Sequence, residues 1–195
     1  MDTFQDYHKL FQQIELLVPL SPSNKESIME YSSLQFFPKK SFVQQQDTVV
    51  YYEYFLVQGC MRTYHTDQNG NEHNLFFATE HWWAGDLESF TRQTPSSFTV
   101  QALEDTTAIA ISHTDIQLLY KEIPQLERFF RILIQNAFVS LQRRIINNLS
   151  QTALERYKQF RTMYPNIEQR ISQKHIASFL GITPEFLSLL RSKHD

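Results

Sequence analysis

The chain has few of the residues that build cofactor and redox sites. Of its 195 residues only 4 are glycine and 1 is cysteine. Loops that cradle phosphates need backbone conformations that only glycine adopts readily, so this scarcity argues against dinucleotide- and nucleoside-triphosphate-binding enzymes. A single cysteine, Cys60, cannot form an internal disulfide, an iron–sulfur site or a Cys-x-x-Cys redox pair.

Long apolar runs and a targeting signal are also missing. Residues 1–6 lack the basic start and the apolar run of a signal peptide. No apolar stretch approaches the roughly 20 residues that cross a bilayer. We therefore expect a cytoplasmic protein without a membrane partner. Its hydrophobic content of 42% and charged content of 20% are ordinary for an ordered globular chain.

Patterns for catalysis and for metal binding are equally scarce. His65, His73 and His81 fall on or beside expected strands, but the sequence has no His-x-His pair of the kind that cupin metal sites use. It also has no Gly-x-Ser-x-Gly elbow. We expect a protein that is not an enzyme, with no metal site and no cofactor.

The sequence is instead rich in aromatic residues and in short strand-like runs between residues 34 and 111. Runs such as Tyr54–Val57, Asn74–Ala78 and Ala108–Ile111 are typical of β-strands. Asn69-Gly70, between two such runs, predicts a hairpin with a tight primed turn in which both residues have positive φ. Helices are expected before these strands, at 4–17 and 23–31. The pattern indicates an antiparallel sandwich or small barrel.

A long helix is predicted to begin at Pro124, because proline fits the first turn of a helix. Apolar residues then recur at steps of four and three, on a stripe too wide for a single partner surface. Two interpretations stay open: the helix pairs with a second copy of the chain, or it is buried within a monomer. The positions expected to face a second copy are Leu126, Phe130, Leu133, Ala137, Leu141 and Ile145.

Charge is distributed unevenly along the chain. The formal net charge is −3, but residues up to 139 include 9 basic and 17 acidic side chains, and those after it include 9 basic and 4 acidic ones. The two parts therefore carry −8 and +5. Such an excess in the C-terminal part favours a polyanion partner, although a solvated helical face would give the same pattern.

Residues 170–193 carry the most specific local signals. Ser172 is placed to cap one helix, and Gly181 suits the left-handed residue that ends it. Thr183 is placed to cap a second helix with Pro184 in its first position, and Ala177 is small enough for the two helices to cross closely. The pattern predicts a helix-turn-helix, with an ordinary helical hairpin as the alternative.

The chain resembles bacterial transcription regulators of the Crp/Fnr type. The runs that carry the resemblance are 54–62, 85–89, 98–102 and 176–183, of which the last is the most specific. The resemblance implies an α+β protein: a cyclic-nucleotide-binding-like antiparallel β-roll over 1–123, a dimerisation helix over 124–149 and a helix-turn-helix domain over 150–195. It also implies double-stranded DNA, a second copy of the chain and RNA polymerase as partners.

The effector region departs from the family pattern. Gly85-Asp86-Leu87 stands where cyclic-nucleotide binders have Gly-Glu-Leu, and Ser96 stands where they have the arginine that neutralises the cyclic phosphate. We therefore predict weak or no cyclic AMP binding, unless Arg92 substitutes for that arginine. Either an unidentified small molecule or no effector at all fits the sequence, and Trp82, Trp83 and Phe90 would wall the cavity or belong to the core. The candidate pocket residues are Gly85, Asp86, Leu87, Arg92, Ser96, Ser97 and Thr99.

The expected recognition helix also departs from the family, whose members often carry guanine-reading arginines there. Here Glu185 and Ser188 could contact base edges, and Arg191 and Lys193 could contact phosphates. No β-hairpin wing is expected beyond this helix. The candidate DNA-binding residues are Ser172, Gln173, Lys174, Thr183, Pro184, Glu185, Ser188, Arg191 and Lys193. The alternative is a small-ligand or cyclic-nucleotide receptor whose degenerate helix-turn-helix contacts a protein.

Overall fold

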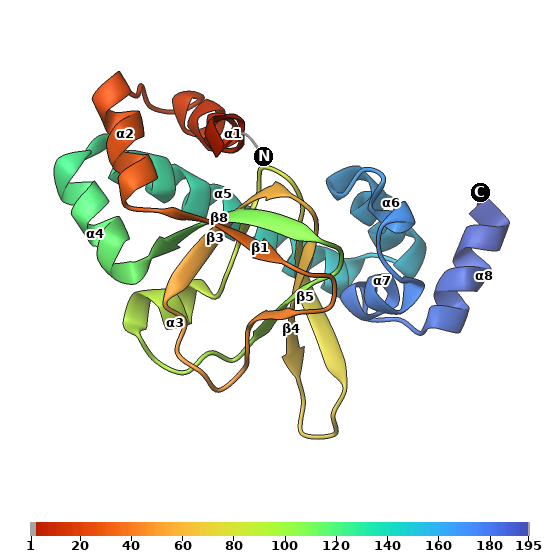
Figure 1. Ribbon diagram of the computed structural model, residues 1–195. Helices are drawn as coiled ribbons and strands as arrows, with labels where there is room; N and C mark the ends of the chain where they lie inside the picture. Colours follow the sequence, from red (N-terminus) through yellow and green to blue (C-terminus); the bar gives the residue numbers. More distant parts are fainter. Residues whose placement is uncertain (1–2, 195) are drawn as a thin grey trace.

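The structure, a computed structural model, describes residues 3–194 and places two antiparallel four-stranded sheets against each other as a β-roll (Figure 1). The strand order is β1-β8-β3-β6 in one sheet and β2-β7-β4-β5 in the other. The strands are β1 Ser33–Phe37, β2 Phe42–Gln44, β3 Tyr52–Gln58, β4 Met61–Thr66, β5 Glu72–Ala78, β6 Trp83–Ala84, β7 Thr99–Ala102 and β8 Thr106–Ser112.

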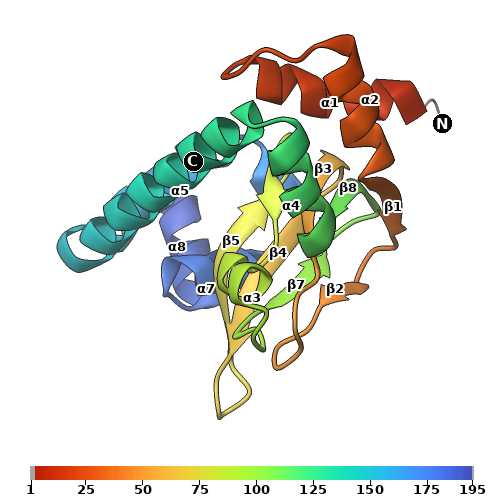
Figure 2. The ribbon, with the colours of Figure 1, turned by 90° about the vertical axis from the view of Figure 1, so that its left-hand side faces the viewer.

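The central strands β3 and β8 are buried on both faces, which explains their uninterrupted apolar sequences. Tyr54 and Leu56 face the interior of the β-roll, whereas Phe55 and Val57 face the helices that cover it. These helices lie together on one side of the β-roll (Figure 2). They are α1 Thr3–Glu15, α2 Pro22–Glu30 and α4 His113–Glu122. A short helix, α3 Leu87–Arg92, follows β6.

The hairpin between β4 and β5 forms where it was predicted, but the predicted two-residue primed turn is wrong. Of its residues only Gly70 has a positive φ, 81°. The Asp67 carboxylate accepts hydrogen bonds from the N–H groups of Asn69 and Asn71, each at 2.9 Å. The N–H of Gly70 donates to the Asp67 carbonyl at 3.0 Å. The side chain of Asp67 therefore organises a longer loop, so Asn69 need not be left-handed.

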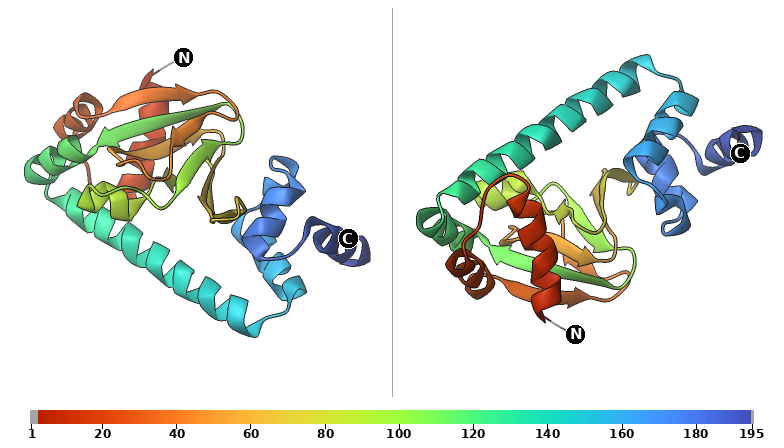
Figure 3. Two further views of the ribbon diagram at one scale, coloured as in Figure 1. Left: turned by 90° about the horizontal axis from the view of Figure 1, so that it is seen from below. Right: turned by 90° about the horizontal axis from the view of Figure 1, so that it is seen from above.

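The long helix α5, Gln125–Ser150, begins directly after Pro124, as predicted. It runs along one side of the β-roll and reaches the C-terminal helices at its far end (Figure 3). Those elements are α6 Ala153–Met163, the 3-10 helix η1 Ile167–Gln169, α7 Gln173–Leu180 and α8 Pro184–His194. Among residues 3–194, no helix combines the length and the apolar character that a membrane span requires.

The two halves of α5 have different surroundings. In the first half, Leu126 is 2% exposed and belongs to the core of its own β-roll, and Phe130 packs edge-on against Trp83 and Tyr120. The expectation that Leu126 faces a second copy is therefore wrong, because the first turns of α5 are covered by the chain itself. In the second half, the positions predicted to face a partner, Ala137, Leu141 and Ile145, are exposed.

Candidate effector cassette and nucleic-acid interface

We call the predicted effector segment, from Gly85-Asp86-Leu87 to Ser96, the cassette. Its central residue, Asp86, accepts hydrogen bonds from groups of its own chain. One carboxylate oxygen caps α3 by accepting from the N–H groups of Glu88 at 3.0 Å and Ser89 at 3.4 Å. The other accepts from the buried hydroxyl of Ser96 at 2.7 Å. The structure thus brings Asp86 and Ser96 together, but as partners of each other.

A second carboxyl group, that of Glu53 on β3, lies beside this pair. A Cβ atom added at Gly85 would lie 2.4–2.7 Å from the Glu53 carboxyl group, so the backbone of Gly85 and this side chain approach each other closely. Burial raises the pKa of Glu53 to about 8, and the negative charge of Asp86 adds to the effect. The Oε1 atom of Glu53 is buried and has no hydrogen-bond partner in the part of the chain that the structure describes.

The other predicted pocket residues have different partners or are exposed. Arg92 pairs with Glu88 at 3.2 Å on the surface, where its side chain is 71% exposed, so it does not replace the family arginine. Leu87 is also exposed. Ser97 accepts a hydrogen bond from His65 through its carbonyl, and Thr99 accepts one from the N–H of Gln46.

The aromatic residues near the cassette divide between core and surface. Trp83 packs on Phe55 with 5.5 Å between ring centroids, and Phe90 belongs to the same buried cluster. Trp82 is 51% exposed. Trp83 and Phe90 therefore pack with the hydrophobic core.

The helix pair α7 and α8 has the caps that the sequence predicts. The Ser172 hydroxyl accepts from the N–H of His175 at 3.4 Å, and the Thr183 hydroxyl accepts from the N–H of Phe186 at 3.2 Å. Gly181 has a φ of 68°, and the N–H of Ile182 donates to the carbonyl of Ala177 at 3.0 Å. This is the hydrogen bond of a Schellman helix end, and it sets the angle between the two helices.

Most of the predicted DNA-binding side chains are exposed. The helix α8 is the element farthest from the β-roll (Figure 1). Arg191 is partly buried and lines a cavity of about 430 Å³ with Arg161 and Glu168. Two apolar residues of α8, Phe186 and Leu189, are 44% and 46% exposed. The exposed members of the predicted set are Ser172, Gln173, Lys174, Thr183, Pro184, Glu185, Ser188 and Lys193.

The C-terminal helices dock on β5, which is the edge strand of its sheet. The Ser178 hydroxyl accepts from the N–H of Asn74 at 3.0 Å and donates to the carbonyl of Glu72 at 2.6 Å. The Arg144 guanidinium donates to the carbonyls of Asn74, Leu75 and Phe179. Side chains of the helices therefore satisfy backbone groups that an edge strand leaves unpaired.

Two arginines make contacts across the boundary between the β-roll and the docked helices. Arg170 pairs with Glu80 at 2.8 Å and with Glu104, and both of these carboxylates belong to the acidic part of the chain. Arg62, on β4, is buried and pairs with Glu72 at 2.7 Å. Its guanidinium also lies 3.2 Å from Nδ1 of His175.

Burial, together with the Arg62 charge, lowers the pKa of His175 to about 4, so this ring is neutral near pH 7. Arg144 and Arg170 belong to the C-terminal charge excess, and both are used within the chain. The assignment of that whole excess to a polyanion partner was therefore too broad.

Little in the sequence indicated that Glu53, Arg144 and Arg170 have structural roles. Glu53 is an acidic residue inside an apolar strand run, and this was the one visible hint. Arg144 and Arg170 look like any surface cation, because the groups that they contact are at least 35 residues away in the sequence.

A family model and several solved structures agree with this geometry. Residues 34–122 match the family model of the cyclic nucleotide-binding domain, which identifies the class of the β-roll. A solved structure assigned to the Crp/Fnr regulators then matches 89% of this chain in fold, and this confirms the fold that the resemblance implies. The chain has no significant match among curated protein sequences.

Three solved structures illustrate the similarity in fold. FixK2 from Bradyrhizobium japonicum is 17% identical with a TM-score of 0.72, and the match covers 83% of each chain. The c-di-GMP-responsive global regulator CLP from Xanthomonas campestris is 13% identical with a TM-score of 0.71, covering 89% of this chain and 91% of that one. A protein assigned to the Crp/Fnr transcriptional regulators from Eubacterium rectale is 19% identical with a TM-score of 0.66, covering 89% and 83%.

Proposed function

We propose that the protein is a homodimeric transcription regulator of the Crp/Fnr family that binds double-stranded DNA through α7 and α8. The observation that carries the proposal is the position of α8. The turn at Gly181 connects this helix to α7, which packs on β5. The side chains of Glu185 and Ser188 on α8 are exposed, and α8 lies far from the β-roll (Figure 1). A recognition helix needs such an exposed face to enter the major groove.

The exposed residues divide into two roles. Glu185 and Ser188 have side chains that accept or exchange hydrogen bonds with base edges. Lys174, Lys193 and Arg191 supply positive charge for phosphates, and Ser172 and Gln173 lie at the start of α7, where helix N–H groups favour phosphate oxygens. If the protein activates transcription, RNA polymerase is a further partner, whereas repression would need no such contact.

The exposed half of α5 supports the dimer. Ile134, Phe138, Leu141 and Ile145 recur at steps of four, three and four and are 42%, 58%, 37% and 52% exposed. This is the a/d spacing with which two helices pair. We call these four residues the seam. A dimer paired along it would present its two reading helices to half-sites about 34 Å apart, one turn of the duplex.

The β-roll in this proposal does not read cyclic AMP in the usual way. A cyclic phosphate in the cassette would lie near the carboxyl groups of Glu53 and Asp86 and would not meet the family arginine, because Ser96 occupies its place. In this proposal the domain either responds to a different molecule or serves only to support the dimer and the DNA-binding helices α7 and α8.

Selection of bound sequences from a random duplex pool tests the proposal. Enrichment of a two-fold-symmetric site would support both DNA reading and the dimer. A gel-shift series then compares Lys193→Glu with Lys121→Glu, a matched charge reversal on the distant α4. We expect Lys193→Glu to weaken binding to every duplex and to lower the salt dependence by about one phosphate contact. Equal binding by the two variants would contradict the assignment.

Sedimentation tests the seam. The variant Phe138→Glu, Ile145→Glu should sediment as a monomer, because two buried carboxylates would face their copies across the interface. Leu118→Glu, an equally apolar-to-acidic change at an exposed position of α4, should leave the dimer intact. A dimer that survives the double substitution would refute the seam.

A second candidate is that α8 binds a protein. The exposed Phe186 and Leu189 favour it, because apolar side chains on an exposed helix face are typical of protein contacts. Salt-insensitive behaviour and no retention on random duplex would support this candidate over DNA binding.

A further inference from the structure

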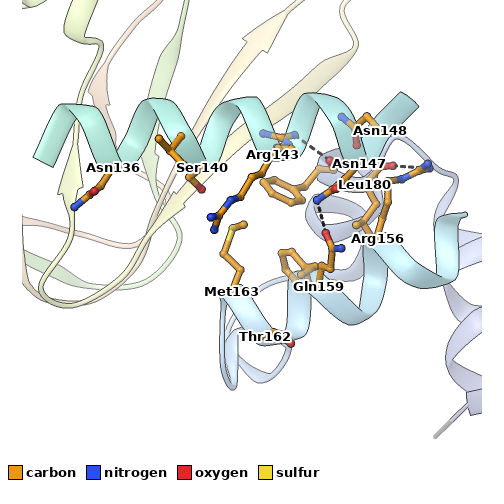
Figure 4. Close-up of a pocket in the computed structure, with 14 residues that line it drawn as sticks. Asn136, Ser140, Arg143, Asn147, Asn148, Arg156, Gln159, Thr162, Met163 and Leu180 are labelled. Carbon is orange, nitrogen blue, oxygen red and sulfur yellow. Dashed lines mark hydrogen bonds between the residues drawn. The ribbon is translucent and has the colours of Figure 1, made fainter. Parts of the chain in front are cut away.

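A cavity of about 720 Å³ lies where α5, α6 and α7 meet (Figure 4). Its α5 side is formed chiefly by Asn136, Ser140, Arg143 and Asn147, with Val139, Arg144 and Asn148 beside them. The four chief positions are each offset by two residues from a residue of the seam, which is roughly 200° around a helix. A dimer paired along the seam therefore leaves the cavity open to solvent, and its volume is within the range of small-molecule sites.

The charges around this cavity are all positive. Arg143, Arg144 and Arg156 line it, and none of its lining residues is acidic. Within residues 3–194, none of the three arginines forms an ion pair with a carboxylate. Positive charge without a counter-charge attracts anions.

The partners of the two more buried arginines are neutral. Arg144 donates only to backbone carbonyls, and its guanidinium stacks 3.9 Å from the ring centre of Phe179. Arg156 donates to the carbonyls of Gln151 at 3.0 Å and Leu180 at 3.3 Å, and its Nε–H is buried without a hydrogen-bond partner among the described residues. Burial lowers the pKa of Arg144, as expected for a cation without a counter-charge.

The rest of the lining suits an organic molecule with an apolar or aromatic part. Val139, Phe160 and Met163 supply an apolar wall. Asn147 and Gln159 are hydrogen-bonded to each other at 2.5 Å, and Asn136 and Thr162 add polar groups around them. In Figure 4, Arg143 and Met163 extend toward each other across the opening of the cavity.

We propose that this cavity binds a small organic anion, with a carboxylate or phosphate group held by Arg143 and Arg156 and an apolar body against Val139, Phe160 and Met163. An extended duplex is a poorer fit than a small molecule, because the cations line a concave cavity between three helices. This role of the ligand rests on the proposed DNA binding. By contacting α5, α6 and α7 together, the ligand would favour one position of the DNA-binding helices relative to the dimer helix α5.

A dye titration without DNA tests the site, so that its failure is separate from any failure of DNA binding. The probe is 8-anilinonaphthalene-1-sulfonate, an organic anion of suitable size whose fluorescence rises in apolar surroundings. We expect Arg143→Glu to weaken its binding at least tenfold. Arg131→Glu, the same charge reversal at an exposed position of α5 outside the cavity, should leave binding within twofold. The proposal would be overturned if the two variants weaken dye binding equally, or if neither variant changes it.

Two further measurements locate the dye and define its anionic group. Ser140→Trp, which adds bulk at an exposed position of the wall, should also weaken binding at least tenfold while circular dichroism stays unchanged. Unaltered affinity in this variant would place the dye elsewhere and overturn the site. Displacement of the dye by pyrophosphate or by citrate then distinguishes phosphate from carboxylate ligands, whereas displacement by neither would contradict an anion site.

Discussion

The cassette of the β-roll and the cavity where α5, α6 and α7 meet, which we call the joint, collect side chains of opposite charge. The cassette brings together the carboxyl groups of Glu53 and Asp86, and the joint brings together Arg143, Arg144 and Arg156. Each contains a buried ionisable group without an opposite charge. Glu53 reduces the cost by keeping its proton, since its pKa is about 8. A guanidinium cannot lose its proton at such pH values, and Arg144 is stabilised by three backbone carbonyls instead.

The comparison shows where an anion would be favoured in this fold. Resemblance directs attention to the cassette, but the cations that anion binding needs are at the joint. The four predictions that follow test this contrast, from the largest expected effect to the smallest.

Cyclic AMP should not bind at micromolar concentration. A missing charge-assisted hydrogen bond costs about 1.5–3 kcal/mol, and two carboxyl groups nearby add repulsion or desolvation. We expect an affinity at least about 100-fold weaker than that of a cassette with its arginine. Isothermal titration calorimetry measures it, with adenosine as the control for contacts of the base alone. A micromolar dissociation constant for cyclic AMP would show that the cassette still reads a phosphate.

Neighbouring arginines of the joint should differ sharply in their effect on stability. Arg144→Leu removes the donors of three carbonyls and the contact with Phe179, and should lower the free energy of unfolding by about 2–3 kcal/mol. Arg143→Leu, one residue earlier and exposed, should change it by less than about 0.5 kcal/mol. Urea unfolding followed by circular dichroism measures both, and similar losses would contradict the structural role given to Arg144.

Asp86→Ala should cost about 1.5 kcal/mol, because it removes the cap of α3 and the partner of Ser96, while the loss of one negative charge near Glu53 offsets part of this. The matched control is Glu88→Ala, a carboxylate in the first turn of the same helix whose ion pair with Arg92 is exposed. It should cost less than about 0.5 kcal/mol. A larger loss of stability in Glu88→Ala than in Asp86→Ala, measured by thermal unfolding, would contradict the structural role given to Asp86.

Glu53 should make the protein less stable as the pH rises. The folded pKa of about 8 lies above the ordinary value of 4.5, so the folded state binds more protons than the unfolded state between these values, and stability falls as pH increases. The loss between pH 7 and pH 9 should be about 1 kcal/mol. Glu53→Gln should flatten this slope while leaving stability below pH 5 nearly unchanged. Denaturation at a series of pH values checks it, and parallel curves for the two proteins would rule it out.

Local signals carried most of what the sequence predicted. The strands, the long helix after Pro124, and the roles of Ser172, Gly181 and Thr183 depend on residues within a few positions of each other. The turn at Gly70 was mistaken because Asp67, at the end of β4, supplies hydrogen bonds that a two-residue motif does not consider.

The features of the sites that could not be predicted depend on distant contacts. Glu53 meets the cassette only after β3 and β6 pair in the sheet. Arg144 meets β5 only after the C-terminal helices fold back, and the α5 stripe separates into core and seam only where the β-roll ends. Charge counting found the basic tail, but it could not show that Arg170 is paired with Glu80 and Glu104.

The edge strand β5 has a consequence for handling the protein. Ser178, Arg144 and Tyr164 cover its outward backbone groups, so these groups are shielded only while the C-terminal helices are docked. An uncovered strand edge is a template for pairing with another chain. A fragment that ends after β8 would display this edge together with the exposed Phe76. The isolated β-roll should therefore aggregate by edge-to-edge association at concentrations at which the whole chain stays dispersed.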